Sequence, residues 1–445
     1  PPPPPPPPPP THFQAEDGIR DLASSLVGSE MCIRDIRYAG ADRNSLPIWS
    51  EPGKPLGGRE ISSTSSCSFA SRINKRMKSW FPRQSLFLRG IAAMLLLAST
   101  SAFAQVPDRL PRPDDKPADL TQPVQVFILL GQSNMLGFGR IDPEDKNGTL
   151  SWLVKRQNSF PHLIDEAGDW TERKDVRNVH VMDKRGVDYR DMNQFSDMKN
   201  EWLTVTQGHI GPELQFGHIM GHVHDEPVLI LKACIGNRSL GWDLLPPGSQ
   251  RFVFEGRTYA GYKDNPSSWV EGEPRKEVNW YAGRQYDADT AHAKKVLENL
   301  EKYYPGYQGQ GYEIAGFVFW QGHKYQNAAH ASRYEQNLVH FIKTLRKDFQ
   351  APDAKFVLAT IAFGGKDLSG HGLAIATAQL AVSGEDGKYP EFKGNVKTID
   401  ARPFWRDKSV SPSGAGHHYN HNAETYMKVG NELGWAMAEL LSEDQ

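Results

Sequence analysis

Short apolar runs alternate with amphipathic segments along the chain from residue 124 onward. Most of the apolar runs are continuous, which is typical of strands buried on both faces of a sheet. They cover residues 124–130, 227–234, 315–320, 355–361 and 395–399. The amphipathic segments repeat apolar side chains with the helical period and cover residues 288–304, 334–349 and 422–441. Strands that alternate with helices predict an α/β fold with a mostly parallel, five-stranded sheet covered on both faces.

Two long insertions interrupt this alternation. Residues 148–208 are mostly polar, and within them residues 179–182 and 201–205 could pair as a small hairpin. Residues 240–285 are rich in Trp, Tyr, Pro and Gly. Loops of this length in a compact domain usually carry function, and aromatic rings in exposed loops could stack on sugars. For any single ring, packing of the insertion onto the domain is the more common role.

Residues 1–76 show neither the strand pattern nor the helical period. Residues 1–10 are all proline, and residues 11–35 resemble the translated read-through of a sequencing adaptor. We interpret residues 1–76 as non-native, adaptor-derived upstream translation and expect them to be disordered. A native proline-rich tail is the alternative.

Residues 77–104 match the pattern of a secretory signal peptide. A positively charged start after Met77 is followed by an apolar stretch over residues 91–98 and a small-x-small cleavage site at Ala102-Phe103-Ala104. We therefore expect translation to begin at Met77 and the mature protein to be secreted or periplasmic. Residues 105–122 are rich in Pro and Asp and indicate an extended linker. Residues 123–445 then form the folded domain.

Composition and charge narrow the partners of this domain. The chain is 38% hydrophobic and 23% charged, as in globular proteins. Its formal net charge of −2 gives no electrostatic footprint for nucleic acid. No stretch after residue 104 is long and apolar enough to span a bilayer, so we expect no membrane span in the mature chain. Cys234 is the one cysteine after residue 104, and its apolar surroundings indicate a small buried side chain.

Residues that suit acyl transfer follow three of the predicted strands. The first strand runs into GQSNM, where Ser133 lies between Gln132 and Asn134, whose amides are expected to hold the turn. The second strand is followed by IGNRS (residues 235–239) and the third by QGH (residues 321–323). In parallel α/β sheets the reactive groups lie just beyond the carboxyl ends of the strands. These segments are therefore expected to meet at one edge of the sheet.

A histidine pair near the C-terminus supplies a candidate base. The motif SPSGAGHHYNHNAETY places His417 and His418 in a glycine-rich loop just before the last predicted helix. Acyl transfer through serine requires a nucleophile, a base within hydrogen-bond reach and donors aimed at the developing oxyanion. The chain offers candidates for all three.

Four blocks of this sequence resemble, in order, those of a known esterase family. GQSNM, the pair GPELQFG and KACIGNRSLGWD, FVFWQGH and HYNHNAETY are similar to the blocks of the sialate O-acetylesterase-like branch of the SGNH hydrolases. That branch also includes acetylxylan esterases, and the resemblance covers Val124 to about Leu441. It implies a three-layer α/β/α fold and a serine esterase that removes O-acetyl groups from an acetylated carbohydrate. No cofactor is required.

The resemblance also implies roles for individual residues. Ser133 corresponds to the nucleophile, and His418 corresponds to the general base. The backbone N–H groups of Ser133 and Gly236 and the side chain of Gln321 correspond to the oxyanion hole. The residues expected to contact the substrate are Gln132, Asn134, Asn237 and His323.

The carboxylate that would orient the base is an open question. Many SGNH enzymes carry an acid three residues before the histidine, and this chain has Ala415 there. We take Asp407, in the same loop, as the third catalytic residue; Asp400 or a backbone carbonyl could orient His418 instead. The missing acid supports a rival function, a carbohydrate-binding or surface-attachment protein on a degenerate esterase fold. Glu213 begins a predicted helix, where a carboxylate favours the helix dipole, and is assigned a structural role.

Clustered histidines raise the question of a metal site. His417, His418 and His421 could bind zinc, with His222 and His224 in reserve. A metal site needs ligands that converge with defined geometry. Adjacent histidines diverge in most backbones, and no nearby Cys or Asp completes a set. We therefore expect no metal site.

Overall fold

The computed structural model describes residues 109–443 except residues 185–187, 207, 325 and 385–386. The predictions for residues 1–76, for the signal peptide at 77–104 and for the first residues of the linker lie outside the described residues. In the described part of the linker, residues 109–122, there is no helix or strand.

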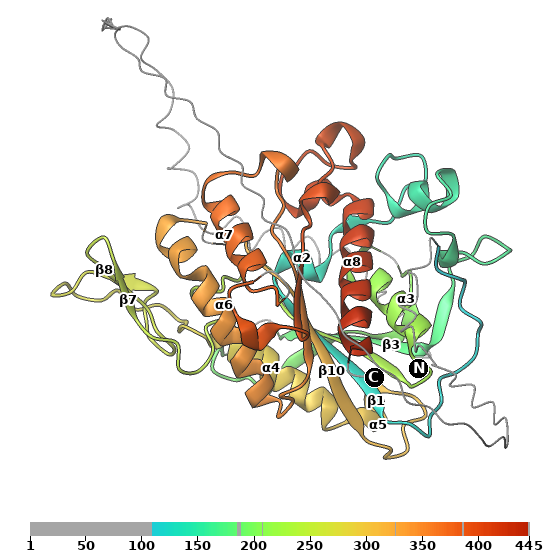
Figure 1. Cartoon of the computed structure of the whole chain (residues 1–445), viewed down its shortest axis with the longest axis horizontal. Helices are drawn as coiled ribbons and strands as arrows, with labels where there is room; N and C mark the ends of the chain where they lie inside the picture. The colour runs from blue at the N-terminus through green and yellow to red at the C-terminus, as the bar shows by residue number, and fades with distance from the viewer. Residues whose placement is uncertain (1–108, 185–187, 207, 325, 385–386, 444–445) are drawn as a thin grey trace, which may run out of the picture. The chain divides into compact units, whose positions relative to one another are not determined.

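A seven-stranded sheet forms the centre of the fold (Figure 1). Its order is β12-β11-β10-β1-β6-β3-β4, and all neighbouring pairs are parallel except β3 and β4. Five strands correspond to the predicted ones: β1 (Val124–Gly131), β6 (Val228–Ala233), β10 (Tyr312–Trp320), β11 (Lys355–Ala359) and β12 (Val396–Ile399). The α/β class and the mostly parallel sheet are confirmed.

The predicted number of five strands is too small by two. β3 (Glu172–Asp183) and β4 (Phe195–Thr204) pair antiparallel, and β3 also joins the main sheet beside β6. The place of β3 in the main sheet is not evident from its sequence, because charged residues occupy some of its buried positions. Arg173 pairs with Asp175, and the Arg177 Nε donates to the Asn200 side chain at 3.0 Å. These partners allow a strand without a continuous apolar run to lie inside the sheet.

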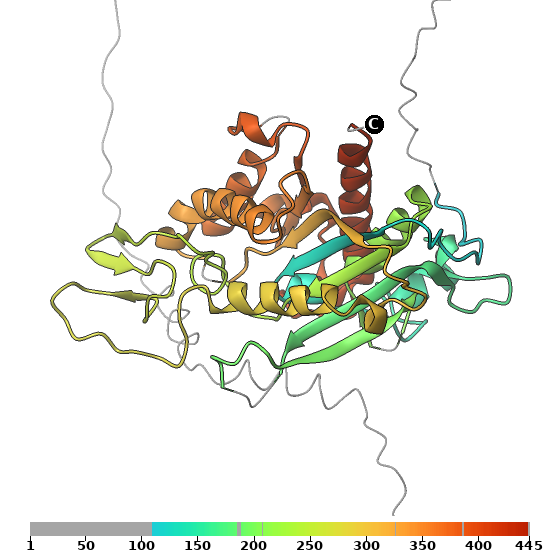
Figure 2. The same cartoon turned by 90° about the horizontal axis from the view of Figure 1, so that it is seen from below.

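Helices cover both faces of the sheet, so the three-layer architecture is confirmed. In β1, Phe127 and Leu129 pack in the core on one face, and Val126 and Ile128 pack in the core on the other. The first face carries α3 (Glu213–Val223) and α8 (Ala423–Ser442); the second carries α4 (Arg284–Leu297), α5 (Leu300–Tyr303), α6 (Ala328–Asp348) and α7 (Gly370–Ala381). Figures 1 and 2 show the two helical layers, and Figure 2 shows α4 running along its face of the sheet.

The predicted helices at 334–349 and 422–441 correspond to α6 and α8. The one at 288–304 divides into α4 and α5. The sequence did not predict α7, because two early glycines and a run of small apolar residues give it no clear amphipathic stripe. Among the helices of the described residues, none has the length and apolar character to cross a membrane.

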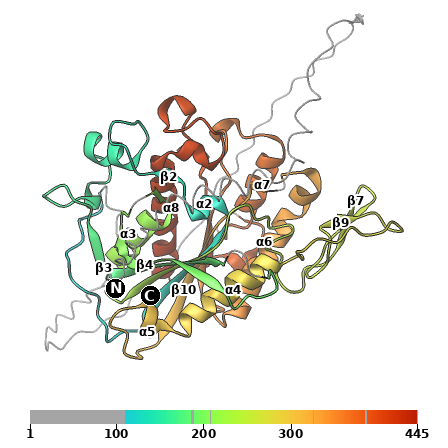
Figure 3. The ribbon, with the colours of Figure 1, turned by 180° about the vertical axis from the view of Figure 1, so that it is seen from behind.

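The second insertion forms a small antiparallel sheet at one end of the domain, seen at the right of Figure 3. Its strands are β7 (Phe252–Phe254), β8 (Arg257–Tyr259) and β9 (Ser268–Trp269). Trp242 and Trp269 are buried in its own apolar cluster with Leu245, Ala260 and Ala282. These two indole rings therefore pack the insertion, as expected for most of its aromatic residues.

Candidate active site

Ser133 begins a one-turn helix directly after the central strand. β1 ends at Gly131, and α2 spans Ser133–Leu136. Gly131 has φ +150°, and a Cβ at this position would lie 2.4 Å from the carbonyl oxygen of Trp320 in β10. Only glycine allows this close approach. The glycine therefore lets the chain turn sharply beside the neighbouring strand, and Ser133 is 8% exposed at the turn.

Gly236 lies directly beside the serine. It follows β6, the strand that pairs with β1 on the side away from β10. A Cβ built on Gly236 would lie 3.6 Å from the Cβ of Ser133. The backbone of the loop after β6 can thus approach a group bound at Ser133, as the oxyanion-hole assignment requires.

The side chain of Gln321 has a fixed orientation. The Tyr334 hydroxyl donates to its Oε1 at 2.9 Å, and its Nε2 donates to the Arg238 carbonyl at 2.9 Å and to the Gln132 Oε1 at 3.3 Å. The Gln379 Nε2 also donates to the Gln321 carbonyl at 2.7 Å. These bonds direct the Gln321 N–H groups toward the loop after β6 and the turn after β1. To donate to an oxyanion, the Gln321 amide would have to give up one of its two hydrogen bonds. The bond to Gln132 is longer than the bond to Arg238 and is therefore the weaker one.

His418 lies in a left-handed turn in front of α8. His418, Tyr419, Asn420 and His421 have φ of 50°, 50°, 54° and 58°. The left-handed conformation costs an L-residue about 1–2 kcal/mol, so four in succession require compensation from the surrounding structure. Tyr419 supplies part of it, because its buried ring stacks on Trp320 and Phe363 at centroid distances of 5.0 and 4.6 Å.

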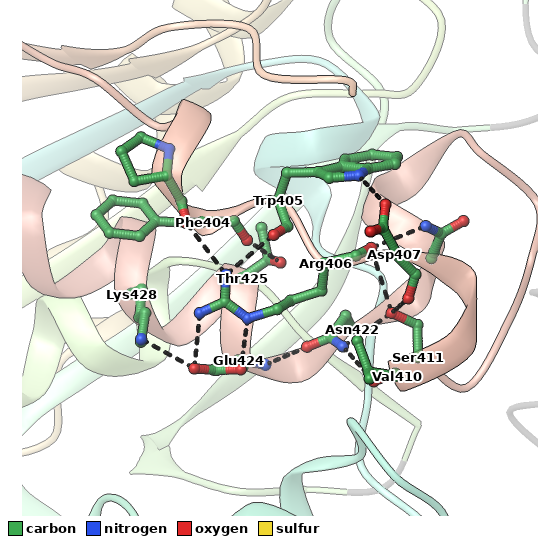
Figure 4. A network of polar contacts seen from close by, with 12 residues as sticks. Phe404, Trp405, Arg406, Asp407, Val410, Ser411, Asn422, Glu424, Thr425 and Lys428 are labelled. Atoms are coloured by element: carbon green, nitrogen blue, oxygen red, sulfur yellow. Dashed lines mark hydrogen bonds and ion pairs between the residues drawn. The ribbon is translucent and has the colours of Figure 1, made fainter. Parts of the chain in front are cut away.

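A polar network holds this turn on the N-terminus of α8 (Figure 4). Arg406 donates to both carboxylate oxygens of Glu424 at 2.8 Å, and Lys428 approaches the same carboxylate at 2.9 Å. Burial opposes the ionised form of Glu424, but hydrogen bonds from Arg406 and Lys428 outweigh it and lower its pKa to about 2. The Asn420 Nδ2 donates to the Arg406 carbonyl at 2.9 Å, and the Asn422 Oδ1 caps the helix.

The His418 ring packs on the segment that follows α2. It stacks face to face on Phe138, with 3.9 Å between centroids and 6° between planes. Burial is the main cause that lowers the His418 pKa to about 3. Four further histidines lower it: His417, His421, His323 and His209. No hydrogen bond within the described part of the chain joins the ring to Ser133. Hydrogen bonds between catalytic groups are often long or poorly aligned before substrate binds.

The structure thus brings Ser133, Gly236 and Gln321 to the carboxyl ends of three neighbouring strands, with the His418 turn packed on the segment after Ser133. A family model described as "carbohydrate esterase, sialic acid-specific acetylesterase" matches residues 123–439. The chain belongs to this family. Its members are carboxylic ester hydrolases, so the predicted enzyme class and family resemblance are confirmed.

Solved structures similar to this esterase share little sequence with it. A protein from Arabidopsis thaliana is 16% identical, with 71% of this chain and 98% of that chain covered and a TM-score of 0.40. XAC1771, a carbohydrate acetylesterase from Xanthomonas citri, is 13% identical, with coverages of 72% and 56% and a TM-score of 0.40. NanS is 11% identical, with coverages of 74% and 99% and a TM-score of 0.41. No curated protein sequence gives a significant match.

The predicted third catalytic residue of the esterase has another partner. The Trp405 indole donates to the Asp407 carboxylate at 2.9 Å, and no contact among the described residues joins Asp407 to His418. Asp400 is held by Arg402 at 2.8 Å. The role of Asp407 stays a prediction, and the His418 ring has no hydrogen-bonded orienting group among the described residues.

The predicted substrate-binding residues of the esterase fall into two pairs. Gln132 and Asn134 are buried, and the Gln132 Oε1 also accepts from the Lys324 backbone N–H at 3.3 Å. Gln132 is therefore placed to hold the turn around Ser133, whereas the buried Asn134 Oδ1 has no hydrogen-bond partner among the described residues. Asn237 and His323 are exposed, so they are the members that a ligand could reach directly.

Sequence reasoning missed a buried ion pair next to α2. Lys232 in β6 is 2% exposed, and its Nζ lies 2.7 Å from the Oε2 of Glu213 in α3. The same Nζ donates to the Leu136 carbonyl at the end of α2, at 3.0 Å. Glu213 also accepts from the Gly211 N–H at 3.2 Å. The signal was a lone lysine inside the apolar run VLILKA, and the structural role assigned to Glu213 fits this position.

Replacement of Lys232 by methionine is expected to destabilise the esterase by about 3–5 kcal/mol, because it leaves the Glu213 carboxylate buried without its partner. Urea unfolding of the full chain measures the loss. The addition of Glu213→Gln should restore part of it, since both charges are then removed. Lys302→Met, which breaks an exposed pair with Asp197, is the control and should cost less than about 1 kcal/mol. Equal losses for Lys232→Met and Lys302→Met would contradict this role.

Proposed function

We propose that this protein is an exported serine esterase that removes O-acetyl groups from carbohydrate, of the sialate O-acetylesterase or acetylxylan esterase type. The observation that carries the proposal is the position of Ser133, which turns out of the central strand directly against the backbone of Gly236. Membership in a carbohydrate esterase family supports an acetylated carbohydrate as the substrate. The signal-peptide pattern in residues 77–104 supports a secreted or periplasmic location.

The reaction follows from the arrangement of these groups. His418 accepts the proton of the Ser133 hydroxyl as the oxygen attacks the acetyl carbonyl. The Ser133 and Gly236 N–H groups and the Gln321 amide donate to the tetrahedral oxyanion. The protonated ring then gives its proton to the leaving sugar oxygen, which leaves an acetyl group on Ser133. Water, deprotonated by His418, then attacks this acetyl-enzyme. The protonated ring returns its proton to the Ser133 oxygen as acetate leaves.

A panel of acetylated substrates tests this function. Purified protein is incubated with O-acetylated sialic acids, acetylated xylan and a chromogenic acetate ester, and released acetate is measured. We expect hydrolysis of the chromogenic ester and of one carbohydrate class. Carbohydrate binding without release of acetate would favour the rival binding protein. Fusion of residues 77–104 to a reporter that is active only after export tests the location separately.

The pH profile of kcat/KM is expected to rise with a midpoint below 6.5, the ordinary value for histidine. Only the neutral ring can accept the serine proton, and the buried His418 surrounded by other histidines has a pKa lowered to about 3. Activity is therefore expected to be lost only as the pH falls well into the acidic range. Rates measured with the chromogenic ester at pH values from about 2 to 9 check this. A midpoint at or above 6.5 would show that an acid pairs with the ring in the working enzyme.

A further inference from the structure

Three histidines of the left-handed turn converge. One ring nitrogen from each of His417, His418 and His421 lies within 4.8 Å of the others, and no carboxylate belongs to this group. The expectation that adjacent histidines diverge does not hold here. The positive φ angles of residues 418–421 bend the chain. As a result, His418 and His421 lie on the same side of the turn as His417.

The chemistry of this group fits a transition-metal ion. Imidazole nitrogens bind Zn²⁺, Cu²⁺ and Ni²⁺, whereas Ca²⁺ and Mg²⁺ prefer oxygen ligands. A Zn–N bond of about 2.1 Å requires ligand nitrogens about 3.4 Å apart in a tetrahedral site. The three ring nitrogens lie within 4.8 Å of one another, so a bound ion would draw them together by little more than 1 Å. Three protein ligands leave one coordination position open to water or a small anion.

The surroundings already orient the ligands. The His417 Nδ1–H donates to the Ala415 carbonyl at 3.0 Å, which leaves Nε2 with a lone pair for a metal. His418 is held flat against Phe138. His421 is half-buried, with the His209 ring 5.9 Å away. Two of the three ligands are therefore positioned before any ion arrives, which lowers the cost of ordering them.

We propose that His417, His418 and His421 bind one divalent transition-metal ion of the zinc class, and that the bound ion inhibits the esterase. The ion takes a lone pair of the His418 ring and holds the ring within the cluster, so that it cannot accept the Ser133 proton. The inhibitory step rests on the proposed role of His418 as the base. The binding step rests on the geometry of the three rings alone.

Direct binding is measured first, independently of activity. The full chain is freed of metal with a chelator and titrated with Zn²⁺ in a calorimeter, and with Co²⁺ while its visible absorption is recorded. One Zn²⁺ per chain and an intense Co²⁺ band typical of four-coordinate nitrogen ligation are expected. Absence of binding in both titrations would overturn the proposal.

Inhibition is then compared across variants. The rate with a chromogenic acetate ester should fall as Zn²⁺ is added and return when chelator is added. His417→Ala and His421→Ala each remove a ligand but keep Ser133 and His418, so the Zn²⁺ concentration for half-inhibition should rise at least about tenfold. His417 is exposed, so its replacement leaves the core intact. His371→Ala, an exposed histidine of α7, is the matched control and should match the unmodified protein.

The outcomes separate this inference from the proposed function. Inhibition that is equally strong in His417→Ala, His421→Ala and His371→Ala would place the ion elsewhere and overturn the site. Binding at the three histidines with no loss of rate would overturn the inhibitory step. A protein that binds the ion but hydrolyses no acetate ester would contradict the proposed function and leave the metal site supported.

Discussion

Replacement of Ser133 by alanine is expected to reduce kcat of the esterase by about 10⁶-fold, the size of effect that follows removal of a nucleophilic serine. The change deletes the oxygen that attacks the acetyl group. It leaves intact the N–H groups of Ser133 and Gly236, so weak residual catalysis from the oxyanion hole should remain. The fold should persist, because the Ser133 hydroxyl makes no hydrogen bond among the described residues.

Rates with the chromogenic ester and with the best carbohydrate substrate check this expectation, and urea unfolding confirms that the variant is folded. Ser332→Ala, an exposed serine of α6, is the control and should keep full activity. If Ser133→Ala retained more than about one hundredth of the rate, another group would be the nucleophile. The catalytic assignment built on the turn after β1 would then be wrong.

The sequence predicted those parts of the fold in which one local pattern decides the structure. β1, β6, β10 and β11 are buried over most of their length, so each is a largely apolar run with little ambiguity. β12 is an edge strand of the sheet, and its residues Lys397 and Thr398 are only partly buried.

The predicted hairpin of residues 179–182 and 201–205 falls in β3 and β4, which pair antiparallel. The place of β3 in the main sheet was not predicted, because Arg173 and Arg177 lie at buried positions. Their polar partners, Asp175 and Asn200, make this burial tolerable, and a pattern of apolar letters carries no information about such pairings.

The candidate site also has one part that the sequence predicts and another part that it does not. The turn at Gly131 could be anticipated, because a glycine between an apolar strand and a serine indicates a sharp change of direction. The geometry of the histidine turn could not, since no local preference predicts four successive non-glycine residues with positive φ. That conformation is stabilised by contacts from distant segments, such as the stacking of Tyr419 on Trp320 and Phe363. Convergence of the histidines is therefore a tertiary property.

The two adjacent histidines should differ sharply when each is replaced by alanine. His418→Ala is expected to lower kcat about 10²- to 10⁴-fold, the usual contribution of a general base. His417→Ala should cost far less, because its exposed ring donates to the Ala415 carbonyl outside the packing around Phe138. Both variants are assayed with chelator present, so that bound metal cannot contribute to the difference.

Asp407→Asn completes this comparison and tests the missing acid. The Asp407 carboxylate accepts from the Trp405 indole, and an amide oxygen can accept the same hydrogen bond. The substitution is therefore expected to change kcat and stability little, which would leave His418 to act without a carboxylate partner. A loss as large as that of His418→Ala, with unchanged unfolding in urea, would show that Asp407 swings onto the ring during turnover and stabilises the imidazolium. A fully active His418→Ala enzyme would contradict the mechanism whatever the result for Asp407, because no base would then be assigned to Ser133.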